Sequence, residues 1–134
     1  MESSTSYFKA YYSDTDAYGV VWHSSYIKWM EAGRMEYLWE RGICLDKVYE
    51  LEKILIPVIE LDVKYKSPAR NGDEIEVITT VHELKPHYIV LDQILKDKNS
   101  DKIFVTARVK CVGVQESSGS IVRTLDRLMT EANV

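Results

Sequence analysis

The sequence has little cysteine and proline, and it contains no long uninterrupted run of apolar residues. Its two cysteines, Cys44 and Cys111, lack Cys-x-x-Cys spacing, which argues against a disulfide framework or a structural zinc site and favours packing roles for both. No apolar run approaches the length of about 20 residues that a membrane-spanning helix needs. The amino terminus has no basic stretch followed by an apolar one, so we expect no secretory signal and a cytoplasmic location.

An excess of basic charge is also missing. Among 134 residues, 17 are Lys or Arg and 21 are Asp or Glu, which gives a net charge of -4. The basic residues are scattered along the chain, which argues against a nucleic-acid partner, because such proteins concentrate cations to neutralise phosphates. The length predicts a single domain over residues 1–134, and the 46% hydrophobic content is ordinary for a globular chain.

Residues 13–42 contain the one long helical pattern in the sequence. Apolar side chains recur there at spacings close to i, i+3, i+4 and i+7: Tyr26, Ile27, Trp29, Met30, Gly33, Met35, Tyr37 and Leu38. Ser24 and Ser25 are candidate N-caps, and Gly42 is a candidate stop signal. We therefore predict an amphipathic helix from about Ser24 to Arg41, in which Glu31 and Arg34 have the spacing of a weak i,i+3 ion pair.

Strand patterns occupy most of the remaining chain. The predicted strands are Tyr7–Tyr12, 56–66, Glu74–Leu84, Tyr88–Leu95 and Lys102–Val114. Residues 43–53 are predicted to form either a short helix or a loop with a helical turn, and Thr124–Ala132 a short C-terminal helix. Three sets of alternating residues are each predicted to share one face: Ile59, Leu61, Val63 and Tyr65; Ile75, Val77, Thr79 and Val81; and Val105, Ala107, Val109 and Cys111. This order of elements predicts an α+β fold in which an antiparallel sheet packs over the long helix.

Three segments carry a family resemblance. They read Asp14-Thr15-Asp16-Ala17-x-Gly19-Val20-Val21-x-His23-x-x-Tyr26, then Glu31-x-x-Arg34-x-Glu36-Tyr37-Leu38, and later Tyr65-x-x-Pro68-Ala69-Arg70-x-Gly72-Asp73. This pattern resembles the hotdog-fold acyl-CoA thioesterases of the 4-hydroxybenzoyl-CoA thioesterase type, in particular the bacterial branch often found alongside the Tol-Pal envelope system. The resemblance implies a sheet of about five strands wrapped around one central helix. It also implies a homodimer that assembles into a homotetramer, with the site between two protomers.

Thioester hydrolysis needs a group that activates water or attacks the carbonyl, and a donor that stabilises the developing oxyanion. By resemblance, Asp16 matches the catalytic carboxylate, as nucleophile or general base, and the main-chain N–H of His23 matches the donor. The His23 ring is expected to have a supporting role. Spacing alone favours Asp16 as a turn residue bonded to nearby backbone, and it is the resemblance of the whole motif that favours the catalytic role. Asp14 is expected to be structural.

Candidate substrate contacts lie in and beyond the same segment. By resemblance, Tyr18, Val21 and Trp22 are assigned to the acyl side of the site, although Tyr18 stands where glycine is common and Trp22 where tyrosine is common. Lys85 and His87 match the region where relatives place basic residues toward the nucleotide of coenzyme A. A solvated turn is the alternative for both. Arg70 could reach a phosphate or brace its loop against Asp73, and the second role is favoured.

Other chemistry has less support in the sequence. Asp14, Asp16 and His23 could supply metal ligands but lack an established ligand spacing, and no Gly-x-Ser-x-Gly elbow is present. We therefore predict an acyl-CoA thioesterase that needs no cofactor and no metal, with acyl-CoA as its partner and a short-chain aliphatic or aromatic acyl group. The rival prediction is a non-catalytic hotdog oligomer that binds acyl thioesters or a protein partner.

Overall fold

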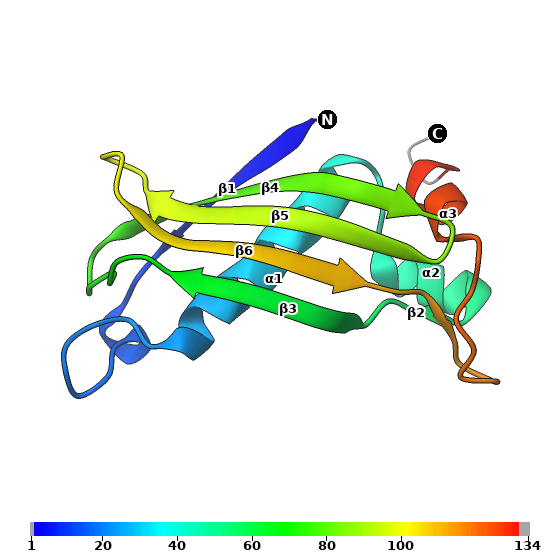
Figure 1. Ribbon diagram of the computed structural model, residues 1–134, viewed down its shortest axis with the longest axis horizontal. Helices are drawn as coiled ribbons and strands as arrows, with labels where there is room; N and C mark the ends of the chain where they lie inside the picture. Colours follow the sequence, from blue (N-terminus) through cyan, green and yellow to red (C-terminus); the bar gives the residue numbers. More distant parts are fainter. Residues whose placement is uncertain (1, 132–134) are drawn as a thin grey trace.

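A five-stranded antiparallel sheet forms the main layer of the computed structural model, which describes residues 2–131 (Figure 1). Its strands are β1 (Ser3–Lys9), β3 (Val58–Tyr65), β4 (Glu74–Lys85), β5 (Tyr88–Asp97) and β6 (Ile103–Cys111). Their order across the sheet is β1-β4-β5-β6-β3, so β1 and β3 are the two edges. The predicted α+β fold with a sheet of about five strands is confirmed.

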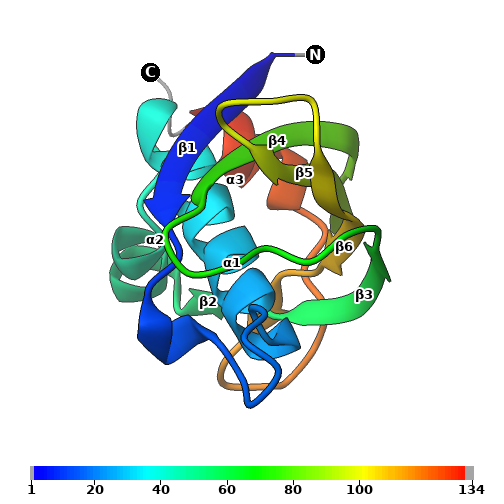
Figure 2. The same cartoon turned by 90° about the vertical axis from the view of Figure 1, so that its left-hand side faces the viewer.

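One long helix, α1 (His23–Glu40), lies in the hollow of the curved sheet, as the end-on view of Figure 2 shows. The short helices α2 (Leu45–Glu52) and α3 (Leu125–Glu131) lie near its C-terminal end (Figure 1). A two-stranded ribbon pairs β2 (Ile54–Leu55) with β7 (Val114–Gln115), and the 3-10 turn η1 (Tyr12–Asp14) leads from β1 toward α1. The ribbon was not predicted.

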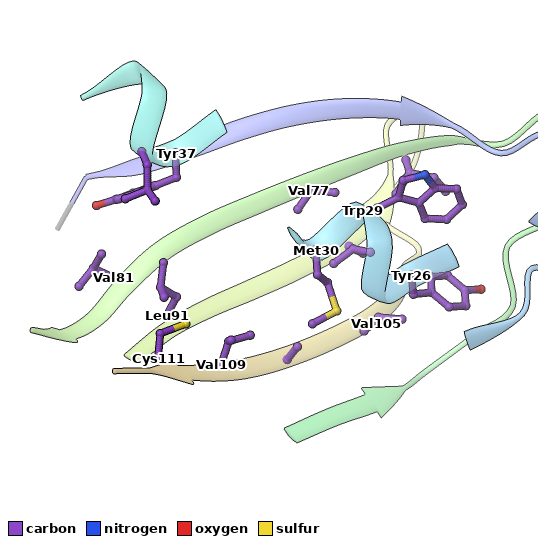
Figure 3. Close-up of a cluster of buried hydrophobic side chains, with 14 of the residues drawn as sticks. Tyr26, Trp29, Met30, Tyr37, Val77, Val81, Leu91, Val105, Val109 and Cys111 are labelled. Atoms are coloured by element: carbon purple, nitrogen blue, oxygen red, sulfur yellow. The ribbon is translucent and has the colours of Figure 1, made fainter. Parts of the chain in front are cut away.

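The core lies between α1 and the inward face of the sheet (Figure 3). Two of the predicted inward sets are buried throughout: Ile75, Val77, Thr79 and Val81 on β4, and Val105, Ala107, Val109 and Cys111 on β6. Strict alternation on these two strands predicted their inward faces correctly, because each strand has neighbours on both sides and a helix over one face. Cys111 is a buried packing residue as predicted, and Cys44 is half-buried.

Gly33 allows the closest approach between α1 and the sheet. A Cβ atom at this position would lie 2.7 Å from Val77 Cγ1, and Val77 is fully buried. Gly33→Ala is therefore expected to lower the free energy of unfolding by about 1–3 kcal/mol, because overpacking outweighs the gain of about 1 kcal/mol in helix propensity. Urea denaturation measures this, with exposed Glu36→Ala as the control. A Gly33→Ala protein as stable as the wild type would contradict the proposed tight contact.

The beginnings of two elements differ from the prediction. β1 covers Ser3–Lys9 instead of Tyr7–Tyr12, because its inward positions are held by buried serines rather than by apolar residues. The predicted N-caps of α1 are also wrong. The helix begins at His23 after an extended Trp22 that makes no side-chain cap. Gly42, with φ +76°, follows the last turn as predicted.

The edge strand β3 is exposed along nearly its whole length, and only Val63 is half-buried. The prediction that Ile59, Leu61, Val63 and Tyr65 form a buried face is therefore wrong for a single chain. β6 is also shorter than predicted and ends at Cys111, and β7 follows after a break. The predicted C-terminal helix is present as α3, while Ala132 lies outside the described residues.

Candidate active site

Asp14 ties the loop before α1 to the first turn of the helix. Its Oδ2 accepts a hydrogen bond of 2.9 Å from the Tyr11 N–H, and its Oδ1 accepts one of 2.9 Å from the Ser25 hydroxyl. The Asp14 carbonyl accepts a further bond of 3.1 Å from the Trp22 N–H. Both carboxylate oxygens are thus engaged within the protein, which supports the structural role predicted for Asp14.

Asp16 lies at the base of a small loop that these bonds close. Its N–H donates to Val20 O (3.0 Å), and its carbonyl accepts from Gly19 N–H (3.0 Å), with Gly19 at the positive φ of +76° that the turn requires. The carboxylate Oδ1 accepts the Tyr18 N–H at 2.8 Å. Asp16 is exposed, and no hydrogen bond to Oδ2 is found within residues 2–131. The Asp16 carboxylate is therefore held in place through Oδ1, and its Oδ2 is available to a ligand.

The N-terminus of α1 directly follows this loop. The pairing of Thr15 with Val21 brings the two ends of the loop together, so the start of the helix is adjacent to Asp16. The main-chain N–H groups of His23 and Ser24 occupy the first helical positions and have no acceptor among the described residues. Because the helix dipole adds a partial positive charge here, this end can stabilise an anionic oxygen.

The third segment of the resemblance packs against the first and holds it in place. Val21 N–H donates to Ala69 O at 2.8 Å, and Ala69 N–H donates to the Tyr26 hydroxyl at 2.9 Å. The Tyr26 ring also contacts the ring of Tyr65, with centroids 5.8 Å apart. Burial raises the pKa of Tyr26, so its hydroxyl stays protonated near neutral pH. This bracing role of Tyr26 was missed in the sequence, where the residue was counted only as apolar.

Arg70 braces its loop through the main chain. Its N–H donates to Asp73 Oδ2 at 2.8 Å, and its carbonyl accepts from Asp73 N–H at 3.0 Å. These bonds to Asp73 support the structural role that was favoured for Arg70, and they are made by its main chain.

The residues assigned to the acyl side differ in exposure. The side chain of Tyr18 is 88% exposed, and Trp22 is 46% exposed with its ring edge against His23 at 5.4 Å. Val21 is buried in the core, so its side chain faces other protein atoms in the single chain. The structure thus brings Asp16, Tyr18, Trp22 and His23 together around one loop and places the Val21 side chain beneath them.

Lys85 and His87 lie far from this loop within one chain. β4 starts near the Asp16 end of the sheet and runs to the opposite end, where the β4–β5 turn meets α3 (Figure 1). There Leu125 N–H donates to Pro86 O at 2.9 Å, and the His87 ring packs edge-on against Tyr88 at 4.7 Å. A single protomer therefore does not combine the predicted nucleotide contacts with Asp16.

A polar cluster beneath the middle of α1 was also missed. Arg34 does not pair with Glu31 as predicted. Its Nη1 donates instead to Gln93 Oε1 at 3.1 Å. Gln93 is buried and uses its Nε2 to bond Met30 O (2.8 Å) and Thr79 Oγ1 (2.9 Å). The signal in the sequence was a lone glutamine at an inward position of β5, where its neighbours on that face, Leu91 and Leu95, are apolar.

Neither a cluster of metal-ligating side chains nor a long apolar helix is present among the described residues. Within residues 2–131, no group of three or more His, Cys, Asp and Glu side chains is placed to hold a metal ion. None of the helices in the same range combines the length and apolar composition needed to cross a bilayer.

Residues 12–129 match the family described as Thioesterase-like superfamily, a range that includes the Asp16 loop, α1 and every strand of the main sheet except β1. The chain belongs to this family. It is 33% identical over 104 residues to the acyl-CoA thioesterase YbgC of Haemophilus influenzae, a match that covers 78% of this chain and 76% of that protein. The chain spans only 51% of the putative acyl-CoA thioesterase YneP of Bacillus subtilis and 61% of the acyl-CoA thioesterase YbgC of Helicobacter pylori.

Solved structures share the whole architecture. A DHNA-CoA thioesterase from Staphylococcus aureus superposes with a TM-score of 0.87 at 25% identity, covering 95% of this chain and 83% of that one. A 4-hydroxybenzoyl-CoA thioesterase variant complexed with 4-hydroxybenzoyl-CoA gives a TM-score of 0.87 at 16% identity, over 98% of this chain and 99% of that one. The second likeness shows the fold alone, and it confirms the hotdog architecture.

Proposed function

We propose that this protein hydrolyses acyl-CoA thioesters to a free carboxylic acid and coenzyme A, with Asp16 as its catalytic carboxylate. The observation that supports this most is the position of a fixed, exposed carboxylate beside a helix N-terminus, where two N–H groups have no acceptor among the described residues. Hydrolysis needs these two functions at one place. A protein that only binds thioesters would not need a carboxylate held in this way.

The proposed reaction begins with the thioester carbonyl oxygen against the His23 N–H. Asp16 either takes a proton from a water molecule, whose oxygen then adds to the carbonyl carbon, or adds to that carbon itself. In both routes the carbonyl oxygen becomes negatively charged and is stabilised by the N-terminus of α1. The carbon–sulfur bond then breaks, and the thiolate takes up a proton. When Asp16 is the nucleophile, water afterwards hydrolyses the mixed anhydride.

The acyl group is proposed to be short-chain aliphatic or aromatic. Support comes from Tyr18 and Trp22, whose exposed rings flank Asp16 and can contact an aromatic or short acyl chain. Relatives whose names give the acyl part of their substrate include the Staphylococcus aureus DHNA-CoA thioesterase. Since the pantetheine arm is common to coenzyme A and to acyl carrier proteins, a carrier-protein thioester could enter the same site.

We also propose that the working unit contains a dimer formed through β3. This edge strand exposes Val58, Leu61 and Tyr65 by 42%, 41% and 52%, and a long exposed apolar edge is a surface that proteins usually cover. Antiparallel pairing of β3 with its copy is two-fold symmetric and would continue the sheet across both chains. The further step to a homotetramer rests on the family resemblance.

This pairing would complete the site. It reverses the strand direction, so the Tyr65 end of one β3 lies beside the Val58 end of the other. Tyr65 contacts Tyr26 near the Asp16 loop, whereas Lys85 and His87 lie at the far end of the same chain. In the dimer, the partner's far end approaches this chain's Asp16. Lys85 and His87 are then proposed to reach the nucleotide from the partner.

Turnover of a panel of acyl-CoAs tests the proposed function. Purified protein is incubated with aliphatic and aromatic acyl-CoAs, and free thiol and free acid are quantified together. We expect one thiol and one acid for each thioester consumed. The rival binding function predicts saturable binding of the same thioesters, measured by calorimetry, without thiol release above the rate in buffer.

The dimer is tested by placing proline on the free edge of β3. Lys66 N–H donates to Phe104 O at 2.8 Å, so by the alternation of an antiparallel ladder the Leu61 N–H points away from β6 toward the free edge. Leu61→Pro removes that donor without breaking the β3–β6 ladder. We expect a monomer with at least about 10²-fold lower activity, because the partner's part of the site is lost.

Leu61→Ala is the control for this experiment, because it shortens the side chain but keeps the N–H. It is expected to remain more dimeric than Leu61→Pro. Size-exclusion chromatography with light scattering measures the mass of both variants. A folded Leu61→Pro protein that remains dimeric would contradict pairing through β3.

A further inference from the structure

A cavity of about 250 Å³ lies between α1, α2 and the beginning of β3, outside the Asp16 loop. Its apolar lining includes Leu38, Ile56, Val58, Leu91 and Cys111. A cavity of about 150 Å³ is enough to hold benzene, so this one has room for a substituted ring or a short chain. Its size suits the acyl part of a small thioester.

Among the described residues, Arg34 is the one cation that lines this cavity. Among residues 2–130, whose side chains are described, its guanidinium makes a single hydrogen bond, to the neutral side chain of Gln93, and no carboxylate forms an ion pair with it. Burial lowers the pKa of Arg34, while Cys111 and Glu31 act in the opposite direction. A guanidinium remains charged in a protein. Arg34 is half-buried. Even partial burial of a charge without an anion is unfavourable, so this guanidinium still needs a negative partner in the cavity.

Glu31 also lines the cavity but does not meet this need. It is exposed, and its carboxylate lies beyond ion-pair distance from Arg34. Solvent and salt screen such a separated, exposed charge. A carboxylate that enters the cavity can reach the guanidinium directly and form the bidentate pair that arginine favours.

In one chain the cavity is too far from Asp16 to receive the acyl group of a thioester bound there. Arg34 follows His23 by eleven positions along α1, which corresponds to about 16 Å along the helix axis. Val58, at the start of β3, is one of the exposed residues that line the cavity. In the dimer proposed above, Val58 would lie beside the partner's Tyr65 and hence near the partner's Asp16. The cavity of each protomer then adjoins the catalytic loop of the other.

We infer that Arg34 selects acyl groups with a terminal carboxylate, and that these groups enter the cavity from a thioester held at the partner's Asp16. This inference rests on the proposed function and names its substrate class. Preferred substrates are coenzyme A thioesters of dicarboxylic acids or of carboxyl-substituted aromatic acids, in which an apolar body separates the thioester from the carboxylate. The apolar walls contact the body, and Arg34 binds the anionic end.

Matched substrate pairs test this inference. We compare kcat/KM for adipyl-CoA with that for hexanoyl-CoA, and for 4-carboxybenzoyl-CoA with that for 4-methylbenzoyl-CoA. In the wild-type protein we expect the carboxylated member of at least one pair to be favoured by about 10-fold or more, since a desolvated ion pair is made with that member alone. In Arg34→Gln this ratio should fall to about one.

Two further variants separate charge from fold. Arg34→Lys keeps the cation and should retain part of the preference, whereas exposed Arg123→Gln makes the same change of charge elsewhere and should keep the full ratio. Wild-type ratios near one in both pairs would overturn the inference. An unchanged ratio of kcat/KM between the carboxylated and the uncharged substrate in folded Arg34→Gln would also overturn the inference. If Arg34→Gln does not fold, the wild-type ratios decide.

The same question can be answered without turnover, using thioether analogues of the four acyl-CoAs that cannot be hydrolysed. Calorimetry should show tighter binding of a carboxylated analogue to the wild type and loss of this difference in Arg34→Gln. That result without any thioester hydrolysis would leave the inference standing and refute the proposed function. Equal rates of hydrolysis for the two members of each pair would refute the inference and leave the proposed function standing.

Discussion

Asp16→Asn is expected to lower kcat for thioester hydrolysis by about 10²–10⁴-fold, the usual contribution of a positioned base or nucleophile. The amide cannot accept the proton from water and is a poor nucleophile. Its Oδ1 can still accept the Tyr18 N–H, which Asp16 accepts at 2.8 Å, so the loop should keep its conformation. Thiol release at saturating acyl-CoA measures the loss.

The control for this variant is Asp101→Asn, which makes the same chemical change at an exposed turn on a different loop. Its kcat should equal that of the wild type. Thermal unfolding should show that the free energy of unfolding of each variant lies within about 0.5 kcal/mol of the wild-type value, as is typical of exposed substitutions. A folded Asp16→Asn protein with wild-type turnover would remove Asp16 from the proposed catalytic role.

His23→Pro is expected to lower kcat by about 10²–10³-fold, which is the second large effect. Proline is tolerated at the first position of a helix, and Trp22 before it already has the extended φ and ψ of -89° and 159° that a residue preceding proline prefers. The substitution therefore removes the His23 N–H while the helix still begins at the same residue. Removal of one hydrogen-bond donor to the oxyanion typically lowers kcat by about 10²–10³-fold.

His23→Ala separates the ring from the main chain, because it removes the imidazole and keeps the N–H. If the N–H is the main contributor, His23→Ala should lose less than about 10-fold, the ring having a supporting role. Circular dichroism checks that α1 is retained in both variants. Equal losses in the two variants would assign the effect to the imidazole instead.

The sequence predicted well the parts of the fold whose side chains alternate between core and solvent. β4 and β6 are central strands with a helix over one face, and their inward sets are apolar and buried. The N-terminal strand was placed too late, because Ser4 and Ser6 face inward there. The Ser4 hydroxyl bonds Glu40 and accepts from Arg41, so a polar contact takes the place of an apolar signal.

Around the candidate site, the sequence predicted contacts better when the two contacting residues are close together along the chain. The tie between Asp14 and the start of α1 spans eleven residues and was anticipated as a structural role. The prediction of Ser25 as an N-cap is wrong, since its hydroxyl donates to the Asp14 carboxylate and the helix begins two residues earlier. Arg34 was assigned to Glu31, its neighbour on the helix, although its partner Gln93 is 59 residues away. Local spacing carries no information about such a contact.

Lys85 and His87 show a different limit of the sequence. His87 lies in the β4–β5 turn as predicted, whereas Lys85 is the last residue of β4. The distance between this turn and the Asp16 loop depends on the length and direction of β4. A strand of 12 residues carries the chain about 40 Å from one end of the sheet to the other. Only a second chain could bring such a turn near Asp16.

Thiol release from acyl-CoA by the wild-type protein, measured beside Asp16→Asn on the same substrates, tests the central claim most directly. We predict that the wild type releases one thiol per thioester, while the folded variant releases it about 10²–10⁴-fold more slowly. Equal rates for the two proteins, or no release by a folded wild-type protein from any thioester in the panel, would contradict hydrolysis at Asp16.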